Sequence, residues 1–356
     1  MYQLAVIPGD GIGPEVVEQG LRVLDRVSEL WNIKYRLKHY PYGANHYLET
    51  GELLPAAALD DIRSMDAIYL GAIGDPRVQP GVLERGIVGT LRFDLDLYVN
   101  LRPIKLYSET VCPLKGKTPA DIDMLVVREN TEGAYLGLGG FARKGTPHEI
   151  ATCEMVFTRF GVERIIRYAF EQTRKRQRKQ LTLVDKVNAI PAHDLWRRTF
   201  DEVGKEYPDV RTERAYVDAA AMWMVKHPEW FDVVVTTNLF GDILTDLGAM
   251  IQGGMGLAAS GNLHPGKVSL FEPIHGSAPR HAGKGKANPL GAVLAVGMML
   301  DFLGEPEAAA HVERSVQHLF TTGAITDLST TSGRSTTETG DMVLQALEQC
   351  HAHGVA

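Results

Sequence analysis

Two aspartates four residues apart, Asp242 and Asp246, form the clearest chemical pattern in the sequence. They lie in residues 238–246 (NLFGDILTD), at the start of a predicted helix, so their carboxylates face the same side. Like charges at this spacing repel unless a cation compensates, and Mg²⁺ binds a few carboxylates together with substrate oxygens and water. The alternative is that both acids only favour the positive end of the helix. Asp218, at the end of a predicted strand, is a further candidate ligand.

Three arginines provide a second pattern. Arg92 lies in a helix-like segment, and Arg102 and Arg128 lie at the ends of strand-like runs. A guanidinium binds a carboxylate through two parallel hydrogen bonds, so these side chains suit a substrate with two carboxylates. Structural ion pairs with neighbouring acids at positions 94, 96 and 129 are the alternative.

Two single residues are candidates for proton transfer. Lys186 follows a predicted strand, and a buried lysine near a cation has a lowered pKa and acts as a general base. Tyr135, within residues 129–135 (ENTEGAY), is a possible general acid. The alternative for each is an ordinary surface or core residue.

Two glycine-containing segments are candidates for contacts with a cofactor. Residues 272–279 (EPIHGSAP) end a predicted strand with small residues, which let a flat ring or a phosphate approach the backbone, and His275 is either a cofactor contact or a turn residue. Residues 8–14 (PGDGIGP) fail the dinucleotide fingerprint because Pro14 replaces its last glycine. We interpret them as a tight strand-to-helix turn that needs positive φ.

Apolar runs alternate with helix-period segments along the chain, which predicts an α/β fold with a largely parallel sheet. The length of 356 residues fits two domains. The predicted strands cover residues 2–7, 65–71, 124–128, 181–185, 211–217 and 231–237. The predicted helices cover residues 14–30, 194–203, 240–250, 290–303, 307–321 and 336–349.

Composition excludes several classes of protein. A net charge of −7 argues against a general nucleic-acid binder, and the basic run 174–179 is interpreted as a solvated helix end. The three cysteines form no metal-ligand cluster, which indicates a reducing compartment. No apolar stretch reaches the roughly 18 residues of a membrane span. Because the N-terminus has no basic leader, we expect a cytoplasmic protein without a membrane partner.

Taken together, these segments resemble the β-decarboxylating dehydrogenase family, which includes the isocitrate and isopropylmalate dehydrogenases. The resemblance covers nearly the whole chain and is carried by six motifs in order: residues 9–15, 100–103, 127–133, 185–188, 237–243 and 275–279. It implies an isopropylmalate dehydrogenase-like fold, with two α/β domains around a largely parallel sheet and no standard Rossmann unit.

The resemblance also implies how the chain is organised. One domain, on the cofactor side, would combine residues 1–99 and 253–356. The other would span residues 100–252 and carry the interface of a homodimer, with an intersubunit arm at about 136–150. Lys186 and Asp218 would reach into the active site of the second copy.

The implied reaction is a metal-dependent oxidative decarboxylation of a (2R,3S)-3-alkylmalate, most nearly 3-isopropylmalate to 2-oxoisocaproate and CO₂, as in leucine biosynthesis. The cofactors would be NAD or NADP with Mg²⁺ or Mn²⁺. The implied roles are catalysis by Tyr135, Lys186 and Asp218; substrate binding by Val88, Arg92, Arg102, Arg128, Tyr135, Lys186 and Asn188; metal binding by Asp218, Asp242 and Asp246; and cofactor binding by Glu272, His275, Gly276, Ser277, Ala278, Arg280, His281 and Asn288.

Substrate and cofactor stay open at this point. Relatives that act on isocitrate present a serine and an asparagine where this chain has Gly86 and Val88, and an apolar lining favours an alkyl substituent over a third carboxylate. An isocitrate, homoisocitrate, tartrate or D-malate dehydrogenase, or a non-catalytic family subunit, are the alternatives. Family membership favours NAD, whereas Arg280, in place of the usual acid, favours the 2′-phosphate of NADP.

Overall fold

The computed structural model describes residues 1–329 and 332–352. The chain divides into two compact units. The first unit comprises Met1–Leu97, Lys105–Pro119 and Ala249–Ala356, and the second comprises Tyr98–Ile104 and Ala120–Gly248. Lys105–Pro119 thus groups with the terminal segments, whereas the sequence analysis assigned it to the central domain. The predicted domain limits themselves stay a prediction.

The first unit contains strands in the order β2-β1-β3-β12-β11. Neighbouring strands are parallel, except that β11 runs antiparallel to β12. Residues 67–72 are buried at every position, which is typical of a parallel strand covered on both faces. The strands are β1 (Tyr2–Gly9), β2 (Tyr35–His39), β3 (Ala67–Ala72), β11 (Ala259–Leu263) and β12 (Ser269–Pro273).

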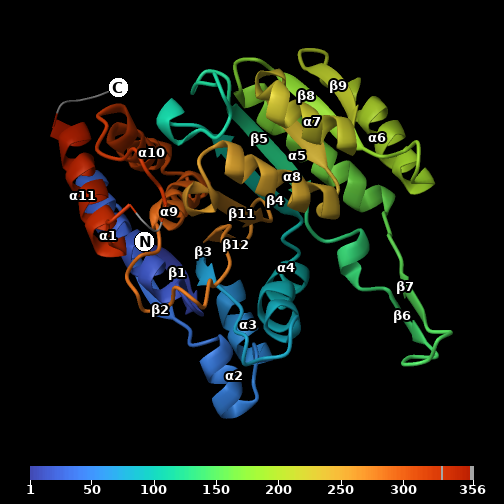
Figure 1. The fold of residues 1–356 in the computed structure, drawn as a ribbon, viewed down its shortest axis with the longest axis horizontal. Coiled ribbons are helices and arrows are strands. Elements are labelled where there is room, and N and C mark those ends of the chain that lie inside the picture. Colours follow the sequence, from blue (N-terminus) through green and yellow to red (C-terminus); the bar gives the residue numbers. More distant parts are fainter. Residues whose placement is uncertain (330–331, 353–356) are drawn as a thin grey trace. The chain divides into compact units, whose positions relative to one another are not determined.

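Helices of the first unit pack around these strands, and α1, α9, α10 and α11 contact one another (Figure 1). The first helix, α1, has Pro14 in its first turn and a left-handed C-cap at Asn32, which are common start and stop signals. The α9 helix is apolar around its whole circumference and is mostly buried. The helices are α1 (Gly13–Trp31), α2 (Ala44–Thr50), α3 (Ala56–Arg63), the π-helix η1 (Glu84–Gly89), α4 (Thr90–Asp94), α9 (Leu290–Phe302), α10 (Pro306–Thr321) and α11 (Thr336–Ala352), with short 3₁₀ turns η2 (Glu109–Val111) and η6 (Met255–Leu257).

The second unit contains strands in the order β4-β5-β10-β8-β9. The pairs β5–β10, β10–β8 and β8–β9 are parallel. The elements are β4 (Val99–Lys105), β5 (Asp123–Glu129), α5 (Arg159–Lys175), β8 (Gln180–Asp185), α6 (Asp194–Gly204), β9 (Arg211–Tyr216), α7 (Val217–Lys226), β10 (Val233–Thr236) and α8 (Asn238–Ile251), with short 3₁₀ turns η3 (Ala134–Leu136), η4 (Pro191–His193) and η5 (Pro228–Trp230). The prediction of an α/β fold with largely parallel strands is confirmed.

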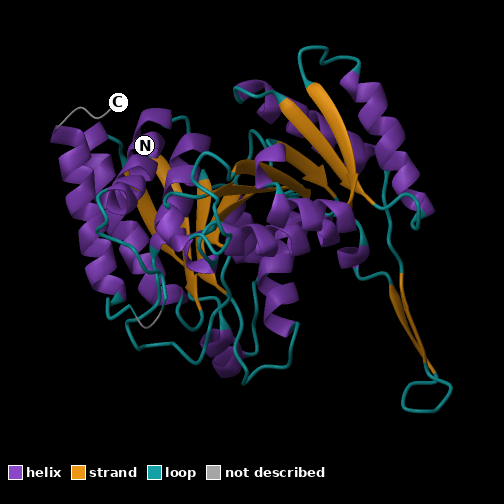
Figure 2. Ribbon diagram, turned by 45° about the horizontal axis from the view of Figure 1, so that its top comes forward, coloured by secondary structure: helices purple, strands orange, loops and turns teal. Residues whose placement is uncertain are grey.

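A two-stranded antiparallel hairpin, β6 (Gly139–Ala142) and β7 (Ile150–Cys153), projects from the second unit (Figure 2). Every residue of both strands is exposed. An isolated two-stranded hairpin is marginally stable in water, so this segment suits an arm that pairs with another chain. Its role between subunits stays a prediction.

The basic run at 174–179 begins in the last turn of α5, as the sequence analysis expected. Its arginines are partnered rather than simply solvated: Arg174 pairs with Asp209 and Arg176 pairs with the buried Asp232. Among the described residues, no helix is both long and apolar enough to cross a membrane.

Close packing inside the first unit yields a prediction about two helical glycines. A Cβ at Gly20 of α1 would lie 1.8 Å from the Tyr69 hydroxyl, whereas a Cβ at Gly297 of α9 would meet no atom closer than 3.6 Å. We expect Gly20→Ala to destabilise the protein by about 1–3 kcal/mol through overpacking. Gly297→Ala should stabilise it by up to about 1 kcal/mol through helix propensity. Urea unfolding followed by circular dichroism measures both, and equal shifts in the two variants would contradict the packing argument.

Candidate active site

The side chain of Arg128 organises the candidate site of the second unit. It lies near the end of strand β5 and is itself only 1% exposed. Its Nε and Nη2 donate to Asn238 Oδ1 at 3.1 and 2.6 Å, and its Nη1 donates to Asp242. The aliphatic part of Arg128 passes over Gly241, where a Cβ would lie only 2.5 Å from Arg128 Cγ. The glycine therefore lets the guanidinium reach the first turn of α8.

A second guanidinium, that of Arg102, lies against the same helix. It comes from β4, where the structure places it within the strand rather than at the predicted strand end. Its Nε donates to Asn100 Oδ1 at 2.9 Å and its Nη1 donates to Thr245 Oγ1 at 2.6 Å. It also lies 4.0 Å from Asp242 and 3.7 Å from Asp246. Thus two nearly buried cations face the two acids of α8.

The two aspartates of α8 differ in their electrostatic environment. Burial would raise the pKa of Asp242, but the guanidinium groups of Arg128 and Arg102 and the Tyr135 hydroxyl together lower it. For Asp246, burial and the neighbouring Asp242 charge raise the pKa in spite of the same arginines. The Tyr135 hydroxyl donates to Asp242 Oδ2 at 3.0 Å, so the predicted acid Tyr135 reaches the predicted metal ligand.

The predicted metal ligands fit a divalent cation only in part within one chain. Asp242 and Asp246 supply carboxylate oxygens on one helix face, and oxygen ligands are what Mg²⁺ and Mn²⁺ prefer. No group of three histidines, cysteines or acids that suits a metal ion occurs within residues 1–329 and 332–352. Asp218 pairs instead with Lys186, so the set of three acids is incomplete in a single chain.

Lys186 and Asp218 form a separate cluster in the second unit. Lys186 lies just after β8, as predicted, and its Nζ donates to Asp218 Oδ1. Asp218 lies in the first turn of α7 rather than at a strand end. The hydrogen bond from Lys186 is the main reason why the pKa of Asp218 is lowered. Asn188, in the loop that follows Lys186, is exposed.

In the first unit, Arg92 of α4 pairs with an acid that lies far away in the sequence. Its Nη2 donates to Glu272 Oε1 at 3.2 Å, and Asn262 donates to the same oxygen at 2.8 Å. Glu272, predicted to contact the cofactor, is therefore the partner of Arg92. Val88 of the π-helix η1 packs against the hydrophobic core of the first unit.

The segment after β12 is anchored by the turn at residues 8–14. The N–H of Ile12 donates to the Ser277 carbonyl at 2.8 Å, and a Cβ at Gly11 would lie 1.9 Å from that same oxygen. Gly9 and Gly11 have φ of 72° and 59°, so the predicted turn with positive φ is confirmed. His275 is partly buried with its Nδ1 3.0 Å from the Gly276 carbonyl, and its Nε2 has no partner among the described residues.

The remaining predicted cofactor residues lie in the loop between β12 and α9. Gly276, Arg280 and His281 are exposed, and Arg280 makes no ion pair with any residue that the structure describes. Ala278 has a left-handed backbone with φ of 40°, which is uncommon for a residue other than glycine. Asn288 lies beside Gly256, where a Cβ would come within 2.9 Å of it.

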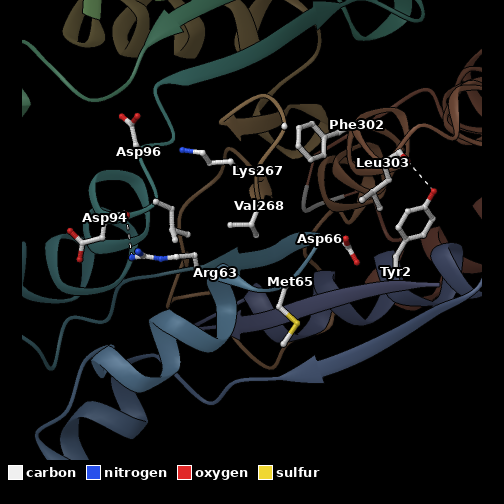
Figure 3. Close-up of a pocket in the computed structure, with 12 residues that line it drawn as sticks. Tyr2, Arg63, Met65, Asp66, Asp94, Asp96, Lys267, Val268, Phe302 and Leu303 are labelled. Carbon is white, nitrogen blue, oxygen red and sulfur yellow. Dashed lines mark hydrogen bonds between the residues drawn. The ribbon is translucent and has the colours of Figure 1, made fainter.

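A cavity of about 640 Å³ lies elsewhere in the first unit (Figure 3). Its lining includes Tyr2, Asp66 and Val268, which directly precede or begin β1, β3 and β12. It therefore lies at the amino ends of these parallel strands, whereas sites in such sheets lie at the carboxyl ends. None of the catalytic, substrate-binding, metal-binding or cofactor-binding residues predicted from the sequence lines this cavity.

The sequence analysis missed residues that hold the arginines. Asn238 and Thr245 accept hydrogen bonds from Arg128 and Arg102, and Asn100 accepts from Arg102. Asn238 and Thr245 lie in the segment that contains the two aspartates, so their position next to Asp242 and Asp246 was the available signal. Their partners on β4 and β5 are far away in sequence, which is why the pairing was not predicted.

The opposite pKa shifts of the two aspartates give a pH prediction. With divalent cations removed, Asp242→Asn should lower the free energy of unfolding at pH 7 by about 1 kcal/mol, a value limited because the side chain is 38% exposed and screened by water. Since its folded pKa is lowered, this loss should shrink as the pH falls below about 4. Asp246→Asn is the matched control: its folded pKa is raised, so the variant should be at least as stable as the wild type at pH 7. Urea unfolding at pH 7 and pH 4 measures both, and a larger loss for Asp246→Asn would overturn the assignment.

Comparison with known proteins gives consistent results. The family model described as isocitrate/isopropylmalate dehydrogenase matches residues 3–343. The 3-isopropylmalate dehydrogenase of Thermobifida fusca is 52% identical over 354 residues, covering 98% of each chain. That of Frankia casuarinae is 56% identical over 317 residues, covering 88% of this chain and 91% of its own.

Solved structures agree with these relatives. The isocitrate dehydrogenase of Methylococcus capsulatus has a TM-score of 0.88 at 38% identity and covers 98% of this chain and 100% of its own. A β-decarboxylating dehydrogenase from Thermococcus kodakarensis, in its apo form, has a TM-score of 0.83 at 34% identity and covers 100% of this chain and 99% of its own. The family model spans nearly the whole chain and these relatives match it over nearly their full length, so the chain belongs to the isocitrate/isopropylmalate dehydrogenase family.

Proposed function

We propose that this chain oxidises and decarboxylates 3-isopropylmalate to 2-oxoisocaproate and CO₂, with a nicotinamide dinucleotide as hydride acceptor. The observation that carries the proposal is the pair of nearly buried arginines facing the two aspartates of α8. Guanidinium groups bind carboxylates, and carboxylates bind a divalent cation. The relatives from Thermobifida fusca and Frankia casuarinae, both named 3-isopropylmalate dehydrogenase, support the choice of substrate and a role in leucine biosynthesis.

Arg102 and Arg128 are proposed to bind a carboxylate of the substrate. Both side chains are held by neutral acceptors, Asn100 and Thr245 for one and Asn238 for the other. Donors that are fixed before the substrate arrives need no reorganisation during the reaction. Arg92 and Asn188 stay proposed substrate contacts on the family resemblance alone.

Asp242 and Asp246 are proposed to hold Mg²⁺ or Mn²⁺ together with Asp218 from a second copy of the chain. When bound, the cation supplies Lewis-acid polarisation of the oxygen on the reacting carbon. Burial, and to a smaller extent the charge of Asp242, raises the pKa of Asp246. A bound cation would favour the ionised form of both carboxylates.

Proton transfers are assigned to Lys186 and Tyr135. Lys186 takes the proton of the substrate hydroxyl while a hydride leaves the same carbon for the nicotinamide. Loss of CO₂ from the neighbouring carbon leaves an electron pair there, and Tyr135 delivers a proton to that carbon. The hydrogen bond from Tyr135 to Asp242 holds the hydroxyl at the proposed site.

Specificity for an alkyl group is proposed to come from η1. Val88 packs on the hydrophobic core, and a Cβ at Gly86 would lie 2.3 Å from Leu53, so neither position presents a polar group. Glu84 of the same helix is an exposed acid. Such a surface offers no partner for the third carboxylate of isocitrate, whose desolvation would then be uncompensated.

The test of the proposal is an initial-rate assay of nicotinamide reduction with Mg²⁺. We expect kcat/KM to be highest for 3-isopropylmalate, with isocitrate, D-malate and tartrate lower by about ten-fold or more, since each methylene in an apolar pocket contributes about 1–3 kcal/mol. A higher kcat/KM for isocitrate would refute the assignment to η1. No reduction with any substrate, from folded protein, would favour a non-catalytic family subunit.

The same assay with NAD⁺ and NADP⁺ decides the cofactor. Arg280 is an exposed cation without an ion pair among the described residues, and we propose that it meets the adenosine ribose of the cofactor. Arg280→Asp should therefore lower kcat/KM for NADP⁺ more than for NAD⁺, because an acid repels a 2′-phosphate. Lys205→Asp, directly after α6 of the second unit, is the charge-matched control and should leave the ratio unchanged.

A homodimer with shared sites makes a separate prediction. Asp218→Asn and Asp242→Asn should each be inactive, while mixed dimers of the two should recover about a quarter of the wild-type rate, since half the dimers are mixed and each keeps one intact site. Dimers mixed from Asp218→Asn and Lys186→Met should recover nothing, because both residues would be contributed to the same neighbouring site. Recovery in the second mixture, or none in the first, would contradict shared sites.

A cytoplasmic location likewise stays a prediction.

A further inference from the structure

A buried histidine, His193, contacts the loop that carries Lys186. It ends the short turn η4, directly before α6, and its side chain is 0% exposed. Its Nδ1 accepts a hydrogen bond from the backbone N–H of Lys186 at 3.0 Å. The histidine therefore holds the peptide group from which the Lys186 side chain extends.

The other ring nitrogen shows that this hydrogen bond has a cost. Because Nδ1 accepts, the neutral imidazole carries its hydrogen on Nε2. Nε2 is buried and has no hydrogen-bond partner among the described residues. An unsatisfied buried N–H is unfavourable, and a phenylalanine would fill the same space without it. The acceptor at Nδ1 is thus the property that distinguishes histidine at this position.

The histidine ring also joins two other segments of the second unit. It packs edge-to-face against Phe157 at 5.3 Å and against Phe240 at 5.2 Å between ring centroids. Phe240 lies two residues before Asp242 on α8. Phe157 follows Val156, whose carbonyl accepts the N–H of Gly133 in the segment that leads to Tyr135. One ring therefore contacts the segments that carry Lys186 and Asp242, and also Phe157, whose neighbour Val156 is hydrogen-bonded to the segment that leads to Tyr135.

Other contacts hold the same loop at different atoms. The Asp185 carboxylate accepts the N–H of Val187 at 3.0 Å and pairs with Arg197. The Lys186 carbonyl accepts from Ala189 and Ile190. The Lys186 N–H itself donates to His193 Nδ1. The orientation of the peptide that precedes the Lys186 side chain thus depends on this ring.

We propose that His193 is a positioning residue that aligns Lys186 for proton abstraction. This inference rests on the proposed function, in which Lys186 is the base. An enzyme whose general base is displaced reacts more slowly but keeps its affinity for substrate. A misplacement of about 1 Å lowers the rate by about 100-fold. His193 itself touches neither substrate nor cofactor.

Two variants separate the hydrogen bond from the packing. His193→Phe keeps an aromatic ring against Phe157 and Phe240 and removes the acceptor, whereas His193→Asn keeps an acceptor near the Nδ1 position and removes the ring. We expect His193→Phe to lose about 10- to 100-fold in kcat, with KM within about two-fold and an unchanged melting temperature. His193→Asn should retain most of kcat even if its melting temperature falls. Rates that follow melting temperature in both variants would overturn the proposal.

The reference variant is Lys186→Met, which keeps the backbone N–H. If it retains wild-type kcat, the proposed base is wrong and the proposed function fails at that step. If it is inactive while His193→Phe has wild-type kcat, only the positioning role of His193 is overturned. The double variant that combines Lys186→Met with His193→Phe should be no slower than Lys186→Met alone. The effects of residues that act through one group are not additive. His193→Gln, whose amide reaches the Nε2 position, replaces His193→Phe if the latter does not fold.

Discussion

The buried positive charge of Arg128 is the constraint on which the second unit depends. A guanidinium that is 1% exposed needs partners for its N–H groups, and losing one partner of a buried pair is strongly unfavourable. Asn238 and Asp242 accept its hydrogen bonds, and both lie near the N-terminus of α8. The end of β5 and the start of α8 are therefore fixed relative to one another by a single side chain.

Charge balance around α8 follows from the same constraint. Arg102 and Arg128 together carry two positive charges, and Asp242 and Asp246 together carry two negative charges when ionised. Their closeness lowers the pKa of Asp242, whereas burial keeps that of Asp246 raised. A dicarboxylate and a divalent cation add opposite charges to this balanced set. Each is therefore expected to bind more tightly in the presence of the other, and this coupling is reciprocal.

Local sequence patterns predicted much of the fold and part of the site. The apolar runs 65–71 and 181–185 became buried strands because burial on both faces leaves a continuous apolar signal. The spacing of Asp242 and Asp246 placed both on α8, as expected. By contrast, Glu272 is paired with Arg92 from 180 residues away, and no local pattern reports such a contact. Asp218 lies in a helix rather than at a strand end, because β9 stops at Tyr216 and the apolar residues that follow are helical.

The packing of His193 could not be predicted from the sequence either, because the histidine ring contacts two aromatic rings from separate segments. A histidine seven residues after Lys186 has no characteristic spacing. The π-helical geometry of η1 was likewise not predicted. Gly86 packs against Leu53, and this contact forms only when both segments are folded.

Gly241 has a consequence for how this sequence can change over evolutionary time. Its backbone φ is not in the left-handed region, so glycine is required there for space alone. A side chain at 241 would meet the Cγ of Arg128 within 2.5 Å. Positions 128 and 241 can therefore drift only together: a lineage that keeps arginine at 128 must keep glycine at 241. A lineage that has replaced the arginine is released from the glycine, so a larger residue at 241 would mark a family member that has abandoned this way of holding a carboxylate.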